Sequence, residues 1–142
     1  MTIAAILETK GRDVLTIDAA TPVREAVRIL ADRRIGALPV IRAGTVAGIM
    51  SERDIIYKLR SDGAPVLDWP VEKIMTAPAI TVTPDQQIMG ALSLMTRRRI
   101  RHLPVVEGGR IVGIVSIGDL VKFRMDRIER EAAELLNYIQ SA

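Results

Sequence analysis

Two serine–aspartate pairs carry the clearest chemical signal in the chain. Ser51 and Asp54 are three residues apart, and Ser116 and Asp119 repeat this spacing 65 residues later. Each pair follows a β-type run and precedes a helical pattern, so the serine is expected to cap a helix whose first turn contains the aspartate. A carboxylate placed there can also accept hydrogen bonds from the two vicinal hydroxyls of a sugar. The spacing therefore predicts two helix N-termini, each with an acid available to a ligand.

Basic side chains are concentrated ahead of the second pair, in the run from Arg97 to His102. A guanidinium can bind phosphate through two hydrogen bonds, and an imidazole can donate a further one, which makes Arg101 and His102 candidate phosphate ligands. The alternative is a solvated basic helix end, which the first three arginines of the run are expected partly to be. The positions 65 residues earlier are Gly36 and Ala37, which offer only backbone groups. The two halves are therefore expected to be unequal, with one better suited to phosphates.

The composition excludes most catalytic and metal-binding chemistry. The 142 residues contain no cysteine and a single histidine, which rules out disulfides, thiolate metal sites, cysteine nucleophiles and a multi-histidine metal site within one chain. The chain has no Walker-type glycine–lysine loop, no Gly-x-Gly-x-x-Gly and no nucleophile beside a general base. We therefore expect a protein without catalytic activity and without a resident metal.

Charge and hydropathy favour a soluble, cytoplasmic protein. The net charge is only +3, and hydrophobic residues make up 49% of the chain against 26% charged residues. Residues 1–13 lack the basic and apolar regions of a signal peptide, and no apolar run is long enough to span a bilayer. Only 3% of the residues are aromatic, which disfavours base stacking and hence nucleic acid as a partner.

The chain contains an internal duplication. Residues 14–59 align with residues 79–124 without a gap and share 13 identities in 46 positions. The shared residues include Arg-Arg-Ile and Leu-Pro-Val within 33–40 and 98–105, and further on the glycine, serine and aspartate positions. Chance does not keep one register over such a length, so the chain consists of two related units.

Each repeat predicts an extended segment, a helix, two strands and a second helix. Apolar residues three and four positions apart predict the first helix, and glycine-containing pairs between two β-type runs predict tight hairpins. The extended segments are 14–17 and 80–82, the hairpin strands are 38–41 with 46–50 and 103–106 with 111–115, and the second helices follow Ser51 and Ser116. Short lead-in helices are expected at 3–7 and 70–75.

A unit of about sixty residues buries too small a share of its surface to be comfortably stable alone, so the two repeats are expected to pack together. We expect an α/β (α+β) fold with two repeats related by a pseudo-twofold axis and their sheets packed face to face. Repeat one with its lead-in helix is expected at residues 1–62, a linker at 63–69, repeat two at 70–125 and a C-terminal helix extension at 126–142.

The motifs of both repeats resemble the cystathionine-β-synthase (CBS) domain. Repeat one carries Leu-Pro-Val, a glycine turn and Gly-Ile-Met-Ser-Glu-Arg-Asp, and repeat two carries Leu-Pro-Val-Val, Gly-Gly and Gly-Ile-Val-Ser-Ile-Gly-Asp. Two such domains in tandem are similar to a Bateman module, and the resemblance runs from the lead-in helix to Arg124. It implies a non-catalytic regulatory module that binds an adenosine-containing ligand between the repeats and relays its occupancy to an unidentified protein partner.

The same resemblance assigns residues to two clefts. It implies that Asp54, Asp119 or both hold ribose, and that the two residues before Leu-Pro-Val contact phosphate. One cleft would then contain Ser51, Asp54, Ile80, Arg101 and His102, and the other would contain Ser116, Asp119, Leu15, Gly36 and Ala37. The adenine would be sandwiched by Leu15 and Ile80 with Ile49 and Ile114, although strand packing explains these apolar residues without any ligand.

The identity of the ligand is less clearly encoded than its class. AMP, ADP, ATP, NAD(H) and S-adenosylmethionine all contain adenosine, and the basic pair Arg101 and His102 favours a phosphate over the sulfonium compound. Arg53, beside Asp54, either adds another cation or is an exposed residue at the start of a helix.

The C-terminal segment carries a short heptad seam. Apolar residues at 121, 125, 128, 132, 135 and 139 are separated alternately by four and three positions, with Glu and Arg between them. Such a helix either lies back on its own module or pairs with a second chain. We favour a homodimer, because the seam would otherwise expose a sizeable apolar stripe.

Two other functions stay open on the sequence alone. The arginine run could bind nucleic acid, which would show a steep salt dependence that nucleotide binding lacks. The chain could also be a ligand-free dimeric adaptor joined through its last helix, in which case no adenosine ligand would raise its melting temperature.

Overall fold

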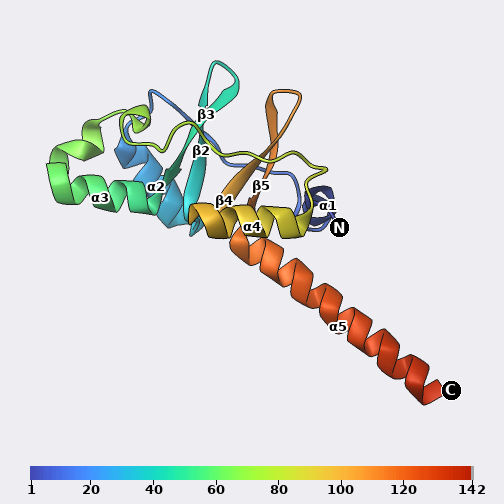
Figure 1. The fold of residues 1–142 in the computed structure, drawn as a ribbon. Coiled ribbons are helices and arrows are strands. Elements are labelled where there is room, and N and C mark those ends of the chain that lie inside the picture. The colour runs from blue at the N-terminus through green and yellow to red at the C-terminus, as the bar shows by residue number, and fades with distance from the viewer. Residues whose placement is uncertain (142) are drawn as a thin grey trace.

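The computed structural model describes residues 1–141 and confirms the mixed α/β fold (Figure 1). Over these residues the α-helices are α1 (Ile3–Lys10), α2 (Val23–Arg33), α3 (Glu52–Asp62), α4 (Ile88–Arg98) and α5 (Ile117–Ser141). The strands are β1 (Ile17–Asp18), β2 (Ala37–Arg42), β3 (Thr45–Ser51), β4 (His102–Glu107) and β5 (Arg110–Ser116). Two 3₁₀ turns, η1 (Ala64–Asp68) and η2 (Val71–Lys73), lie between the repeats. One sheet has the order β1-β2-β3 and the other consists of β4 and β5.

Both predicted hairpins are present and are closed by two-residue turns. Ala43 and Gly44 join β2 to β3 with φ angles of 52° and 80°, and Gly108 and Gly109 join β4 to β5 with φ angles of 59° and 78°. Positive φ at both positions matches the right-handed twist of the strands, which explains why small residues are placed there. Each hairpin also has a register shift at the same place, after Val40 and after Val105.

The predicted extended segments are shorter in the structure than in the sequence pattern. Segment 14–17 forms only the two-residue β1, which pairs in parallel with β2, and segment 80–82 forms a single bridge between Val82 and Val105. Pro39 and Pro104 are the third residues of β2 and β4. Proline has no backbone N–H to donate to a neighbouring strand, so the pairing with the extended segments does not continue toward the start of either strand.

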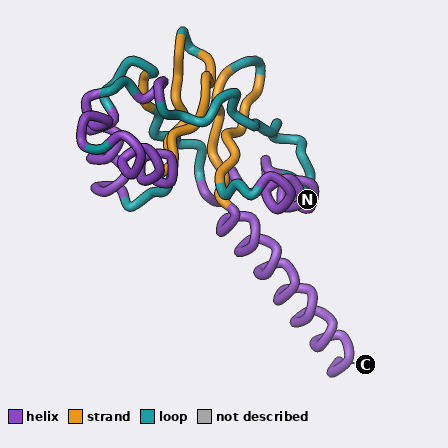
Figure 2. Tube along the Cα trace, turned by 60° about the vertical axis from the view of Figure 1, so that its left-hand side comes forward, coloured by secondary structure: helices purple, strands orange, loops and turns teal. Residues whose placement is uncertain are grey.

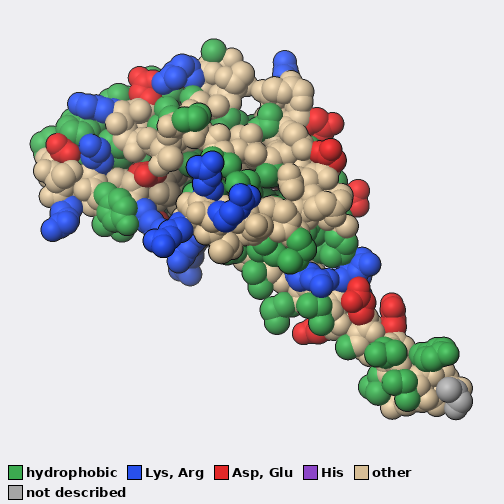
Figure 3. Space-filling view, viewed as in Figure 1, with side chains coloured by type: hydrophobic (Ala, Val, Ile, Leu, Met, Phe, Trp, Pro, Cys, Tyr) green, Lys and Arg blue, Asp and Glu red, His purple; other side chains and the backbone are tan. Residues whose placement is uncertain are grey.

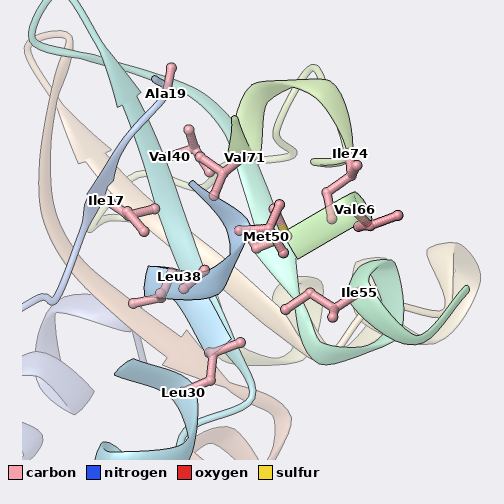
Figure 4. Packing of buried hydrophobic residues seen from close by; sticks show 12 residues of the cluster. Ile17, Ala19, Leu30, Leu38, Val40, Met50, Ile55, Val66, Val71 and Ile74 are labelled. Atoms are coloured by element: carbon pink, nitrogen blue, oxygen red, sulfur yellow. The ribbon is translucent and has the colours of Figure 1, made fainter. Parts of the chain in front are cut away.

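Each repeat has its own apolar core, and each core is completed by a segment that precedes the other repeat. The first core contains Ile17, Leu38 and Met50 together with Val66 and Val71 from the connection between the repeats (Figure 4). The second core contains Leu103, Val115 and Leu120 together with Ile3 and Leu7 of α1. The lead-in segments are therefore exchanged between the two repeats, which ties the repeats into one folding unit.

The two lead-in segments differ in structure. The helix expected at 3–7 is present as α1, but the helix expected at 70–75 is only the 3₁₀ turn η2. The physical reason is that the chain after η2 leaves the helical path to pair with a strand: Thr76 and Ile49 exchange backbone hydrogen bonds of 2.9 Å in both directions. A continued helix would have removed these groups from the edge of β3.

Glycines on β3 and β5 allow the lead-in segments to approach the sheets closely. A Cβ added to Gly48 would lie 2.7 Å from the carbonyl oxygen of Thr76, and one added to Gly113 would lie 2.7 Å from Cδ2 of Leu7. Strands β3 and β5 also contact each other, and the two hairpins stand side by side at the centre of the body (Figure 1).

Helix α5 begins in the second repeat and then leaves the body. Leu120 in its first turns is completely buried, whereas the seam residues Met125, Ile128, Leu135 and Ile139 are 48–61% exposed. Figures 1 and 2 show the helix projecting into solvent, and Figure 3 shows hydrophobic side chains gathered at its far end. Over the described residues, the alternative in which this helix lies back on its own module is therefore wrong.

Candidate functional site

The first cleft has a volume of about 260 Å³ and is walled by both repeats. The ends of β2 and β3 and the first turn of α3 supply one wall, and residues before β4 and between η2 and α4 supply the other. The structure brings together here the residues that the sequence grouped with Asp54, namely Ser51, Ile80, Arg101 and His102, and adds Ile49, which the sequence assigned to the adenine without choosing a cleft. Their role as ligand contacts stays a prediction.

Asp54 is held in this cleft by a capping box at the start of α3. The Ser51 hydroxyl accepts a hydrogen bond of 3.2 Å from the Asp54 N–H, and the Ser51 N–H donates one of 2.9 Å to Asp54 Oδ2. The Ser51 hydroxyl also lies 3.0 Å from Oδ2, and the Thr76 hydroxyl donates a bond of 3.0 Å to Oδ1. All the donors to this carboxylate are neutral groups.

Three arginine residues line the first cleft. Arg101 was predicted there, Arg53 was left between two interpretations, and Arg99 was expected partly to be a solvated helix end. Arg99 caps α4 in the left-handed conformation, with φ of 54°, and this turns the chain so that the residues after it enter the cleft. Guanidinium groups gathered around one cavity favour an anionic ligand.

The second cleft has a volume of about 380 Å³ and is also lined by residues of both repeats. It contains the residues that the sequence assigned to it, namely Leu15, Gly36, Ala37, Ser116 and Asp119, and also Ile114 from the predicted adenine sandwich. Lys10, Asp13, Arg34, Ile35 and His102 complete its lining. Gly36 and Ala37 line the first cleft as well, so these two residues are not confined to one site as the sequence suggested.

Asp119 forms the same cap as Asp54 but has a different outer partner. Its N–H donates to the Ser116 hydroxyl over 3.1 Å, and its Oδ2 accepts from the Ser116 N–H over 2.8 Å. The ammonium of Lys10 lies 2.6 Å from the same oxygen. Burial alone would raise the pKa of Asp119, but the hydrogen bonds from Lys10 and the Ser116 backbone outweigh it and hold the pKa below its usual value.

His102 lies between the two clefts and lines both. Its ring atom Cε1 would be 3.2 Å from a Cβ added to Gly36, so a larger residue at that position would press on the imidazole. Burial and then the charge of Lys10 lower the pKa of His102, and the nearby Asp119 and Glu52 only partly oppose them. The lowered pKa favours the neutral imidazole, which can still donate one hydrogen bond.

The sequence reasoning missed Lys10 and Thr76, the outer partners of the two aspartates, and also Tyr57 and Pro78 in the first cleft. Lys10 and Thr76 lie outside the aligned parts of the repeats, so the internal duplication gave no signal for them.

Within residues 1–141, no group of three or more His, Cys, Asp or Glu side chains could hold a metal ion. In the same range no helix combines the length and the apolarity needed to cross a membrane.

Comparison with known proteins agrees with this architecture. The chain belongs to the CBS-domain family, because it matches the CBS domain over residues 7–61 and again over residues 71–126. It is therefore a CBS pair, the class of regulatory module that the sequence motifs indicated.

Individual relatives share the whole pair. The crystal structure of the CBS-domain containing protein ATU1752 from Agrobacterium tumefaciens is 38% identical, with a TM-score of 0.83 over 87% of this chain and 99% of that one. The mitochondrial CBS domain-containing protein CBSX3 of Arabidopsis thaliana is 35% identical over 98% of this chain and 72% of its own length. Because that relative is named as mitochondrial, the cytoplasmic location stays a prediction.

A third similarity concerns ligands. The CBS pair of protein MJ0100, solved in complex with 5′-methylthioadenosine and S-adenosyl-L-methionine, is 26% identical, with a TM-score of 0.78 over 89% of this chain and 98% of that one.

Proposed function

We propose that this CBS pair binds one adenosine-containing nucleotide (AMP, ADP, ATP or NAD(H)) in the first cleft and relays its occupancy to a partner. Asp54 accepts the ribose hydroxyls, Arg101 and His102 bind the phosphate, and Ile49 and Ile80 flank the adenine. The observation that carries the proposal is that an acid from repeat one and a basic pair from repeat two line the same cleft.

The hydrogen bonds around the Asp54 carboxylate support ribose binding. Its hydrogen-bond donors are the Ser51 backbone and two hydroxyls, and a hydroxyl can turn to accept a bond from a ligand when the carboxylate takes a ligand hydroxyl. Hydrogen bonds to a charged acceptor are the stronger kind, each contributing about 1.5–3 kcal/mol. A diol can therefore bind here without displacing a cation.

The charge of the cleft supports a phosphate-bearing ligand. Arg53, Arg99 and Arg101 all line it, and a sulfonium ligand would bring a further positive charge among them. The MJ0100 complexes support the adenosine class, and the guanidinium groups of this chain favour its phosphorylated members.

Calorimetric titration and thermal unfolding with AMP, ATP, NADH and S-adenosylmethionine test the proposal. A nucleotide at a hundredfold excess over its Kd should stabilise the protein by about 2.7 kcal/mol, a rise in Tm of about 9 °C for a chain of this length. Failure of all four ligands to bind would contradict the proposal and favour the ligand-free adaptor.

A matched pair of variants separates ribose binding from helix capping. Asp54→Asn and Asp119→Asn alter equivalent capping boxes, and Asp119→Asn also loses the ion pair with Lys10, so the control should cost the folded state at least as much. Only Asp54→Asn should weaken nucleotide binding, by about tenfold to a hundredfold. Equal binding by both variants and the wild type would exclude Asp54 as the ribose ligand.

We also propose that α5 pairs with α5 of a second copy. A seam with alternating spacings of three and four residues is narrow, and a second helix with the same repeat covers it. In a parallel pair, Arg124 at one flank of the seam would face Glu129 of the other copy, an attractive combination at the flanking positions. A dimer of this kind would join two nucleotide-binding bodies at one end.

Sedimentation velocity tests the dimer. Leu135→Glu places a charge in the seam and should convert the protein to a monomer, whereas Arg130→Glu on the opposite face should leave the dimer intact. Both residues are exposed in the single chain, so neither change should unfold the body. A monomeric wild type, or dissociation by both variants alike, would refute the pairing.

A further inference from the structure

The two clefts differ most in the group that donates a hydrogen bond to the aspartate from outside the capping box, which is called the outer donor here. The capping boxes are alike, with Ser51 or Ser116 donating to the carboxylate through its backbone N–H over 2.9 or 2.8 Å. In the first cleft the outer donor is a neutral hydroxyl, and in the second it is the ammonium of Lys10. The two clefts therefore differ in a donor that lies outside the repeated sequence.

Lys10 is fixed at two points. Its ammonium donates to Asp119 over 2.6 Å and to the backbone carbonyl of Ile114 over 2.8 Å. Ile114 is the counterpart of Ile49, whose carbonyl accepts from the Thr76 backbone N–H in the first half. One lysine side chain thus supplies two hydrogen bonds of the kind that Thr76 supplies in the first cleft, one to the aspartate and one to the edge strand. The aspartate oxygens differ, because Lys10 donates to Oδ2 of Asp119 and Thr76 donates to Oδ1 of Asp54.

The chemistry of the two donors decides what each carboxylate can still bind. A hydroxyl is both donor and acceptor, so the Thr76 hydroxyl can stay in place and hydrogen-bond to an arriving sugar. An ammonium only donates, and Lys10 donates to Oδ2 of Asp119 beside the Ser116 N–H, so an arriving sugar hydroxyl would meet a donor that cannot accept a bond in return. Its positive charge also neutralises Asp119, which makes that acid a weaker acceptor for a neutral diol.

We propose that Lys10 closes the second cleft to nucleosides, so that the chain binds a single nucleotide at Asp54. This inference rests on the proposed function, because it concerns the same class of ligand. The α1 helix supports it, since Ile3 and Leu7 are buried in the core of repeat two and hold Lys10 beside Asp119. The closure is therefore part of the folded state and needs no ligand.

Removal of the ammonium should open the second cleft. Lys10→Met copies Met75, which occupies the position 65 residues later, and Lys10→Gln keeps a polar side chain of similar length in case the methionine variant folds poorly. Arg12→Met is the matched control, because Arg12 is exposed and its loss changes the net charge by the same amount. The measurement is equilibrium dialysis with labelled adenosine, which carries the diol without phosphate, and with labelled AMP.

The expected result is one bound ligand per chain for the wild type and Arg12→Met, and two for either Lys10 variant, with the second lost again when Asp119→Asn is added. A wild type that already binds two ligands, or Lys10 variants that still bind one, would overturn the role of Lys10 while leaving the proposed function intact. Absence of binding by every protein would refute both.

Discussion

The substitution of Gly48 by alanine tests how the exchanged lead-in segment positions the first cleft. The added Cβ would lie 2.7 Å from the carbonyl oxygen of Thr76 and 2.7 Å from Sδ of Met75. The methionine sulfur can move aside, but the carbonyl belongs to the backbone that pairs with Ile49. The Gly48→Ala change must therefore push residue 76 away from β3, and with it the hydroxyl that contacts Asp54.

The cost can be estimated from packing. Overpacking at a tight backbone contact costs about 1–3 kcal/mol, while replacing glycine in a strand recovers about 0.5–1 kcal/mol of chain entropy. The net loss of about 0.5–2 kcal/mol corresponds to a fall in Tm of about 2–7 °C for a chain of this length. Gly113→Ala is the control, because its Cβ would meet only side-chain atoms of Leu7 and no backbone atom. Leu7 is buried, but a side chain can repack where the paired backbone of residue 76 cannot, so the loss should be smaller.

Urea unfolding of both variants gives the free energies, and titration with AMP gives the effect on the first cleft. Gly48→Ala should lose more stability than Gly113→Ala and should also bind nucleotide more weakly than the wild type. A larger loss of stability from Gly113→Ala would contradict this reasoning. It would show that side-chain packing of α1 on β5 is less tolerant of an added methyl group than the backbone contact of residue 76 on β3.

Three further predictions concern ionisation and capping. The folded pKa of His102 lies below its ordinary 6.5, so stability should fall as the pH drops through about 6.5, and unfolding of His102→Gln should lack this slope. The folded pKa of Asp119 is also depressed, so its contribution is complete above about 4 and is lost as the pH falls through the folded value. Acid unfolding of Asp119→Asn should accordingly depend less on pH below about 4 than that of the wild type. Ser51→Ala and Ser116→Ala should each cost about 1 kcal/mol in urea unfolding, and a negligible loss in either would show that its cap is dispensable.

Much of this fold follows from local patterns in the sequence. The 65-residue duplication, the glycine turns and the three-and-four spacing of apolar residues predicted both hairpins and the helices after them, because these features depend on neighbours close in the chain. The grouping of Ser51 and Asp54 with Arg101 and His102 came from the family resemblance, and the structure places these residues in one cleft. Their contact with a ligand stays a prediction.

The outer partners of the two aspartates depend on contacts distant in sequence. Lys10 reaches Asp119 only because α1 packs on the core of repeat two, and Thr76 reaches Asp54 only because the segment after η2 packs on repeat one. No periodicity within 3–10 or 71–76 encodes this exchange. The length of β1 was similarly unpredictable, since it is set by the hydrogen bonds that its neighbour β2 can supply.

Helix α5 also gives the molecule a long lever arm. Its 25 residues span about 37 Å at the usual rise of 1.5 Å per residue. Its first turn contains Asp119, to which Lys10 tethers the end of α1. A tilt of α5 by about 10° about its first turn would displace the C-terminal end of the helix by about 6 Å. A small rotation at the start of this helix is thereby enlarged at its far end.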